Sequence, residues 1–155
     1  MDEGVQRKAA EDLKNLSSER ADNRVKIAAA GAIPPLVALL GPQSSEGVQE
    51  GAAWVLKNLA ANADNKIEIA AAGAIPPLVA LLGPQSSAGV QKQAAWVLKN
   101  LSVNADNKIK IAAAGAIPPL VALLGAQCSA EVQEQAAWAL MNLCQNDNNK
   151  LMIRC

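Results

Sequence analysis

The stretch "GAIPPLVALLG" occupies residues 31–41, and the same residues return at 73–83 and 115–125, which gives a period of 42. Segments 31–72 and 73–114 agree at 36 of 42 positions. A period of this size in an Ala- and Leu-rich sequence is typical of stacked helical units, each of which buries its apolar face only against its neighbours. The repeat therefore predicts an all-α solenoid.

Glycine and proline residues divide each repeat into three predicted helices. "ADNKIEIAAAG" at 63–73 predicts a short first helix with Asp64 as its N-cap, and Gly73 can adopt the left-handed conformation that follows a helix end. Pro76 and Pro77 fit the opening turn of a second helix, where backbone N–H groups have no partner within the helix. "AGVQKQAAWVLKNLSVN" at 88–104 predicts a third helix of about four turns.

The whole chain, residues 1–155, is predicted to form a single array of these units. Complete units span 22–61, 64–103 and 106–145, residues 3–18 match a third helix alone, and residues 147–155 match a first helix alone. Neither end shows the polar outer face of a terminal cap. A homo-oligomer that stacks through the exposed solenoid ends is therefore one expectation.

The composition argues against catalysis and against a cofactor or metal. The chain has no His and no Tyr, and its three Cys show no CxxC spacing, so no nucleophile–base pair, zinc site or disulfide framework is expected. A formal net charge of zero predicts no nucleic-acid partner, and the apolar stretch 69–82 is too short and interrupted to span a membrane. The start lacks a secretory signal, which favours the cytoplasm or nucleus.

The three tryptophans occupy equivalent positions in "AAWVLKN" at 52–58 and 94–100 and in "AAWALMN" at 136–142. On a helical projection of the first of these segments, Val48, Leu56 and Leu59 belong to one apolar sector. Trp54 and Asn58 lie roughly 120–160° from the centre of that sector. Core packing is the usual role of a Trp at helical spacing, but this phase places the Trp away from the core.

Stacking in a solenoid aligns equivalent residues along one surface, about 8–10 Å apart. An extended peptide on that surface offers backbone groups to which each Asn amide can donate and from which it can accept. Each Trp would wall a slot for the stem or the cationic tip of a Lys or Arg side chain. The predicted peptide-binding residues are the tryptophans and asparagines Asn15, Trp54, Asn58, Trp96, Asn100, Trp138 and Asn142.

The pattern "DNK…I…AGAIPPLV.LL" followed by "VQ..A.W.L.NL" resembles the armadillo repeat over essentially the whole chain. The first half is similar to the repeats of plant and fungal armadillo proteins, including plant U-box ubiquitin ligases, and the "WxxxN" half is similar to importin-α. The resemblance implies a right-handed α-solenoid of three-helix repeats. It also implies that Trp54/Asn58, Trp96/Asn100 and Trp138/Asn142 bind an extended peptide, which in importin-α is a basic nuclear localisation signal.

This sequence departs from the importin-α pattern in its charges. The position that precedes each Trp by four residues reads Glu50, Lys92 and Glu134, and the two acidic residues are included in the predicted site. Another column, Lys14, Lys57 and Lys99 followed by Met141, is either a row of solvated lysines or a row that favours acidic ligand residues at the groove edge. The first such segment, at residues 3–18, carries Glu11 at the Trp position and keeps only Asn15.

Two functions of different classes therefore remain open. The first is a non-catalytic scaffold that holds an extended segment of another protein along a concave Trp/Asn ladder. The alternative is a structural or engineered array, or a fragment, that self-associates through uncapped ends and has no ligand of its own. Near-identical units are typical of consensus-designed or recently duplicated arrays.

Overall fold

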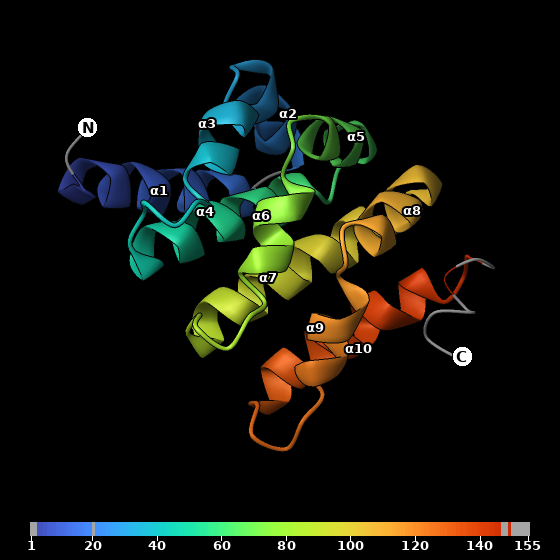
Figure 1. Cartoon of the computed structure of the whole chain (residues 1–155). Coiled ribbons are helices and arrows are strands. Elements are labelled where there is room, and N and C mark those ends of the chain that lie inside the picture. The colour runs from blue at the N-terminus through green and yellow to red at the C-terminus, as the bar shows by residue number, and fades with distance from the viewer. Residues whose placement is uncertain (1–2, 20, 147–148, 150–155) are drawn as a thin grey trace.

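The computed structural model describes residues 3–19, 21–146 and 149, and the described chain is helical without strands. Three kinds of helix alternate, as the repeat predicts (Figure 1). The first helices are α2 (Ala21–Ala29), α5 (Ala63–Ala71) and α8 (Ala105–Ala113), and the second helices are α3 (Ile33–Ala38), α6 (Ile75–Ala80) and α9 (Ile117–Ala122). The third helices are α1 (Glu3–Glu19), α4 (Glu46–Leu59), α7 (Ala88–Leu101) and α10 (Ala130–Leu143).

Side-chain caps set where the helices begin. Helix α5 starts one residue before the predicted cap, because the Asn62 side chain, on an extended backbone, accepts a hydrogen bond from Asn65 N at 3.0 Å. Asp64 lies in the first turn, so its prediction as the N-cap is wrong. Ser87 caps α7 by accepting from Val90 N, and serines at the same repeat position cap the other two well-bounded third helices.

Glycine and proline make the sharp bend between the first and second helices. Gly73 has φ of +84°, in the left-handed region that follows a helix end, and the equivalent glycines of the other repeats agree with it. Three and four residues later, Pro76 and Pro77 occupy the first turn of α6. The predicted roles of these residues are confirmed.

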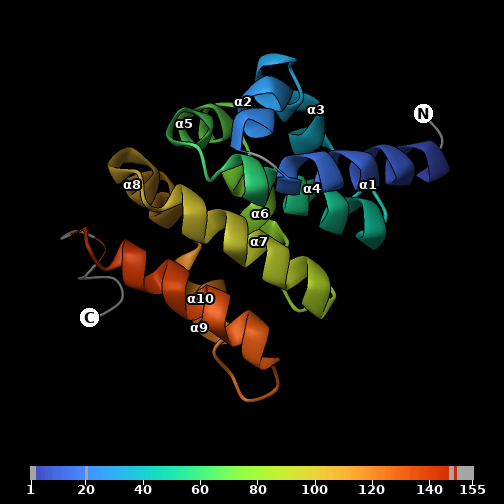
Figure 2. The same ribbon diagram turned by 180° about the vertical axis from the view of Figure 1, so that it is seen from behind.

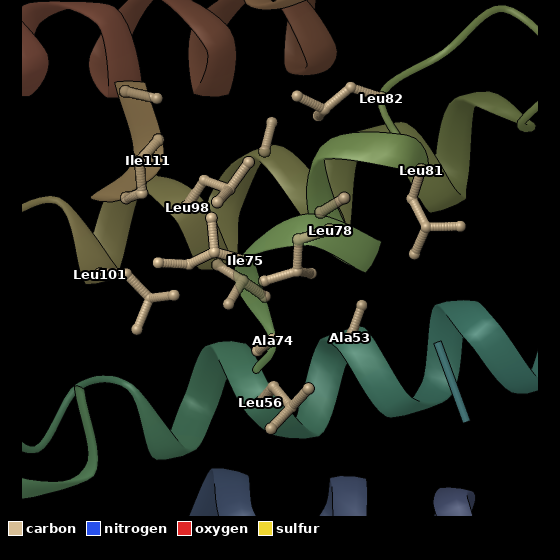
Figure 3. Packing of buried hydrophobic residues seen from close by; sticks show 14 of the residues in the cluster. Ala53, Leu56, Ala74, Ile75, Leu78, Leu81, Leu82, Leu98, Leu101 and Ile111 are labelled. Atoms are coloured by element: carbon tan, nitrogen blue, oxygen red, sulfur yellow. The ribbon is translucent and has the colours of Figure 1, made fainter. Parts of the chain in front are cut away.

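The interior is a continuous apolar layer shared between repeats. The third helices pack against one another in the order α1, α4, α7 and α10 (Figure 2). Leu56 of α4, Leu78 of α6 and Leu98 of α7 are fully buried members of one cluster, and Figure 3 shows Leu78 between the helices that carry the other two. Burial of each leucine side chain contributes about 1.5–3 kcal/mol to the free energy of unfolding. Because adjacent repeats supply these contacts, each unit depends on its neighbours, as in other solenoids.

Buried amides connect adjacent layers at the helix ends. Asn65 donates through Nδ2 to Leu59 O at 3.0 Å and to Arg24 O, 41 residues earlier, at 3.4 Å. Asn107 makes the equivalent bond to Lys66 O, and Asn149 makes it to Lys108 O at 3.2 Å. Except for Asn149, the predicted first helix over 147–155 lies outside the described residues.

Candidate functional site

The predicted site lies on the solvent-facing side of the third helices, away from the buried apolar layer. None of the tryptophans belongs to the buried apolar cluster. Trp54 and Trp96 are half-buried, whereas Trp138 of α10 is 48% exposed. The structure therefore places successive indoles on adjacent third helices, α4, α7 and α10, at the phase that the helical projection predicts.

Lysines from the neighbouring turns lie over the indoles. The Nζ atoms of Lys14 and Lys57 lie 4.0 and 3.8 Å from the ring centroid of Trp54. The Nζ atoms of Lys57 and Lys99 lie 4.1 and 4.7 Å from the ring centroid of Trp96. These distances are within the range of cation–π attraction. We call this alternation of Lys14, Trp54, Lys57, Trp96 and Lys99 the lysine–tryptophan stack.

Lys57, at the centre of the stack, is a buried cation with cationic neighbours. The residue is 6% exposed, so the interpretation of the column as a row of solvated lysines is wrong here. Burial lowers the pKa of its ammonium group to about 8, with further contributions from the positive charges of Lys92, Lys14 and Lys99. Among the described residues, no carboxylate lies within ion-pair distance of Lys57 Nζ.

The acidic residues of the predicted site lie near members of this stack. Glu50 is half-buried, and its carboxylate lies over Gly89 of the next layer, so close that a Cβ at that glycine would clash with it. Glu134 is exposed, and its charge opposes the effect of burial, which lowers the pKa of Lys99. Lys92 forms an ion pair with Glu131 at 3.0 Å.

The asparagine column connects the layers as well as lining the surface. Asn100 donates through Nδ2 to Lys57 O at 3.0 Å, and Asn142 donates to Lys99 O and to Ser102 Oγ, each at 3.1 Å. With both amide hydrogens engaged, Asn142 offers only its Oδ1 acceptor to a ligand. Asn58 is half-buried and also engaged, and Asn15 is exposed on α1.

Two hollows open on the same surface. One, of about 300 Å³, lies between α7 and α10 and is lined by Lys99, Asn100, Val103, Trp138 and Asn142. The other, of about 270 Å³, lies between α1 and α4, and both acidic and basic side chains surround Trp54 there. Its lining residues are Arg7, Glu11, Lys14, Gly47, Glu50, Gly51 and Trp54. Of the predicted residues, Glu50 and Trp54 line the second hollow, and Asn100, Trp138 and Asn142 line the first. The other four predicted residues line neither hollow.

The orientation of Trp54 is set by packing and not by a hydrogen bond. Its Nε1 is buried and has no hydrogen-bond partner among the described residues. An unsatisfied buried donor of this kind costs about 1–3 kcal/mol. The two ammonium groups over the ring supply an attraction that opposes this cost.

The lysines of the stack are the residues whose role sequence analysis missed. Their signal was present, because each lysine follows a position of the Trp column by three residues, which places both on one helix face. The repeat then places Lys14 and Lys57 beside the indoles of the next layer, Trp54 and Trp96. What the pattern could not show was that the ammonium groups turn onto the rings instead of into solvent.

The helix order, the three-helix unit and the repeat period agree with one family. The sequence model of the Armadillo/beta-catenin-like repeat matches residues 20–61, 62–103 and 104–145. The chain belongs to the armadillo repeat family. These matches begin two residues before each predicted unit and end at the same residues. Among curated proteins, U-box domain-containing protein 13 of Arabidopsis thaliana is 49% identical over 55 residues, which cover 36% of this chain and 8% of that protein.

Solved armadillo structures are similar over nearly the whole chain. A designed armadillo repeat protein in complex with the peptide (KR)4 has a TM-score of 0.89 and 36% identity, covering 99% of this chain and 64% of that one. A structure of computationally designed armadillo repeat proteins for modular peptide recognition has a TM-score of 0.89 and 33% identity, covering 98% of this chain and 64% of that one. An engineered protein of the Northeast Structural Genomics Consortium has a TM-score of 0.90 and 34% identity, covering 98% of this chain and 63% of that one. The chain thus spans less than two thirds of these relatives.

The structure also bears on the expectations about metal sites, membrane spans and cysteines. The described residues contain no cluster of metal-binding side chains, and none of the described helices is long and apolar enough to cross a membrane. Cys128 is free, whereas Cys144, at the end of α10, is disulfide-bonded.

Proposed function

We propose that this armadillo array is a non-catalytic scaffold that holds an extended peptide of another protein along the third-helix face. The observation that carries the proposal is the hollow beside Trp138. There a half-exposed indole, the Oδ1 acceptor of Asn142 and the Lys99 side chain surround one open space of about 300 Å³. An apolar surface with a few polar groups beside it is typical of a recognition site.

The similar structures support the same function. One designed armadillo relative was solved with a bound peptide, and another was designed for modular peptide recognition. Four third helices at about 8–10 Å spacing would contact about eight extended residues. Because an extended peptide loses conformational freedom on binding, we expect weak affinity for single short ligands.

Intrinsic fluorescence provides a direct test, because the chain has three Trp and no Tyr. Blocked peptides of about eight residues, one acidic, one basic and one uncharged, should include at least one that shifts the tryptophan emission saturably. Trp138→Ala should weaken that peptide at least tenfold without changing the unfolding midpoint, because the indole is half exposed. Ile109→Ala removes a side chain of similar exposure (51%) from a first helix and serves as the control.

The peptide affinity of asparagine variants must be measured together with their stability. Asn100→Ala and Asn142→Ala remove amides that also bond to the preceding layer, so lost binding has meaning only where the fold persists. If none of the three peptides perturbs the emission, or if Trp138→Ala binds like the parent, the proposed peptide-binding function is wrong.

A second candidate, self-association, is favoured by the apolar surfaces at the two ends of the described array. A hollow of about 400 Å³ between α1 and α3 is lined almost entirely by apolar atoms, among them Leu13, Leu36 and Leu39. At the other end, Leu124 is 42% exposed, whereas its repeat equivalents Leu40 and Leu82 are 1% and 2% exposed. The next repeat covers those two leucines, so a second copy of this chain could cover Leu124 by the same packing.

Sedimentation over a range of concentrations tests this candidate. Head-to-tail contact predicts a sedimentation coefficient that rises with concentration in the parent and stays constant in Leu124→Glu. Ile67→Glu introduces the same charge at an exposed site on a first helix and should behave as the parent does. A parent that remains monomeric at the highest concentration would exclude end-to-end stacking.

A further inference from the structure

We propose that the third-helix face selects an acidic extended peptide, whose Asp or Glu side chains meet the lysine–tryptophan stack and whose one apolar side chain occupies the hollow beside Trp138. This inference rests on the proposed peptide-binding function and deepens it by naming the chemistry of the ligand. It follows from three observations on the same surface.

The first observation is that the chain's own lysines occupy the cation positions of two indoles. Lys57 Nζ lies 3.8 Å from the ring centroid of Trp54 and 4.1 Å from that of Trp96. Lys14 and Lys99 add a second ammonium group over each ring. A Lys or Arg of a ligand would have to displace one of these groups to gain the same attraction. Two of the three slots that sequence analysis assigned to a basic ligand, those at Trp54 and Trp96, are therefore already filled.

The second observation is the sign of the charge around those slots. Lys14, Lys57 and Lys99 form a row of positive charges across α1, α4 and α7, and no carboxylate of the described residues pairs with Lys57. Glu11 and Glu50 line the hollow beside Trp54 together with Arg7 and Lys14, and the Glu50 carboxylate lies over Gly89. The charge of Glu134 acts on Lys99, at the C-terminal end of the row. A ligand carboxylate beside the half-buried Lys14 or Lys99 would be attracted by this row, whereas a ligand cation would be repelled.

The third observation is the change of chemistry at α10. The lysine column ends in Met141, and both Met141 and Trp138 are 48% exposed. No ammonium group lies over the Trp138 ring among the described contacts. This end of the surface therefore suits an apolar side chain, while Asn142 Oδ1 can accept a backbone N–H of the ligand beside it.

The test compares three peptides of about eight residues with blocked ends and one Leu near one end. The acidic peptide alternates Asp with Glu, the basic one alternates Lys with Arg, and the uncharged one alternates Ser with Asn. Tryptophan emission at low salt reports binding. The acidic peptide should bind at least tenfold more tightly than the uncharged one, and the basic peptide should bind more weakly than either. The advantage of the acidic peptide should shrink as the ionic strength rises, because salt screens exposed charges.

Variants assign the effect to the stack. The double variant Lys14→Gln/Lys99→Gln should lose at least tenfold in affinity for the acidic peptide, and the ratio of its affinities for the acidic and the uncharged peptide should fall toward one. Lys26→Gln/Lys110→Gln removes the same charge from exposed positions of first helices and should stay within about twofold of the parent at moderate salt. Circular dichroism would verify that each variant is folded.

A second double variant keeps the test decisive if the first one unfolds. Glu50→Gln/Glu134→Gln leaves every lysine in place and should tighten the acidic peptide several-fold. Equal or tighter binding of the basic peptide than of the acidic one would overturn this inference while leaving the peptide-binding function intact. If no peptide bound, the proposed function itself would fail, so the two failures are distinguishable.

Discussion

The substitution Lys57→Met tests whether the buried ammonium group costs stability. Methionine is the residue that the chain itself has at the equivalent position, 141, of the last third helix. Both side chains are unbranched and of similar length, so the change removes the charge with little change in volume. The substitution therefore isolates the electrostatic contribution of the ammonium group within the lysine–tryptophan stack.

The expected change in the free energy of unfolding on Lys57→Met is the difference between two opposing effects. A pKa lowered from 10.5 to about 8 corresponds to a cost of at most about 3 kcal/mol for the protonated group in the folded state. Loss of two cation–π contacts costs about 1 kcal/mol each, and sulfur–aromatic contacts of Met return part of that. We therefore expect Lys57→Met to be about 1–2 kcal/mol more stable than the parent at pH 7.

The dependence on pH gives the sharper test. Because the folded pKa lies below the unfolded value, the unfolded chain binds more protons between about pH 8 and 10.5, and the stability of the parent rises with pH through that window. The advantage of Lys57→Met should therefore be full below pH 8 and vanish near pH 10.5. Besides burial, the charged groups that lower the pKa of Lys57 are Lys92 and Lys99 of α7 and Lys14 of α1.

Urea denaturation followed by circular dichroism, at pH 7 and near pH 10.5, measures this difference. Because the other lysines titrate in both proteins, the quantity compared is the stability difference between variant and parent. Lys110→Met, at an exposed site on α8, should leave the midpoint unchanged. A Lys57→Met protein that is less stable than the parent at pH 7, by an amount independent of pH, would show that the cation–π attraction exceeds the cost of burial.

Three further substitutions test how the repeat is built, each by its urea midpoint. Leu78→Ala should cost about 2–5 kcal/mol, because the fully buried side chain leaves a cavity between α4 and α7; a loss below 1 kcal/mol would mean that the layers close over the gap. Ser87→Ala should cost about 1 kcal/mol through loss of the α7 cap, whereas Ser87→Asn should be nearly neutral. Gly73→Ala should cost about 1–2 kcal/mol from the left-handed backbone alone, since no atom lies within 4 Å of the added Cβ; Gly73→Asn should recover part of that loss.

The sequence alone was sufficient for the fold. The period of 42, the left-handed glycine before each second helix and the paired prolines at its start are local signals that do not depend on distant contacts. The helical phase also placed Trp54, Trp96 and Trp138 outside the apolar cluster. The N-cap of α5 was misassigned, because Asn62 and Asp64 are both good cap residues and only the backbone conformation at Asn62 distinguishes them.

Tertiary structure decided what the surface residues do. The lysine–tryptophan stack and the bonds from Asn100 and Asn142 to carbonyls 43 residues earlier join side chains of different repeats. A periodic sequence shows that such residues align, but it does not show whether a long side chain turns to solvent or onto the next layer. That choice depends on the distance between adjacent third helices and on the desolvation of Lys57, and both arise only when the repeats pack.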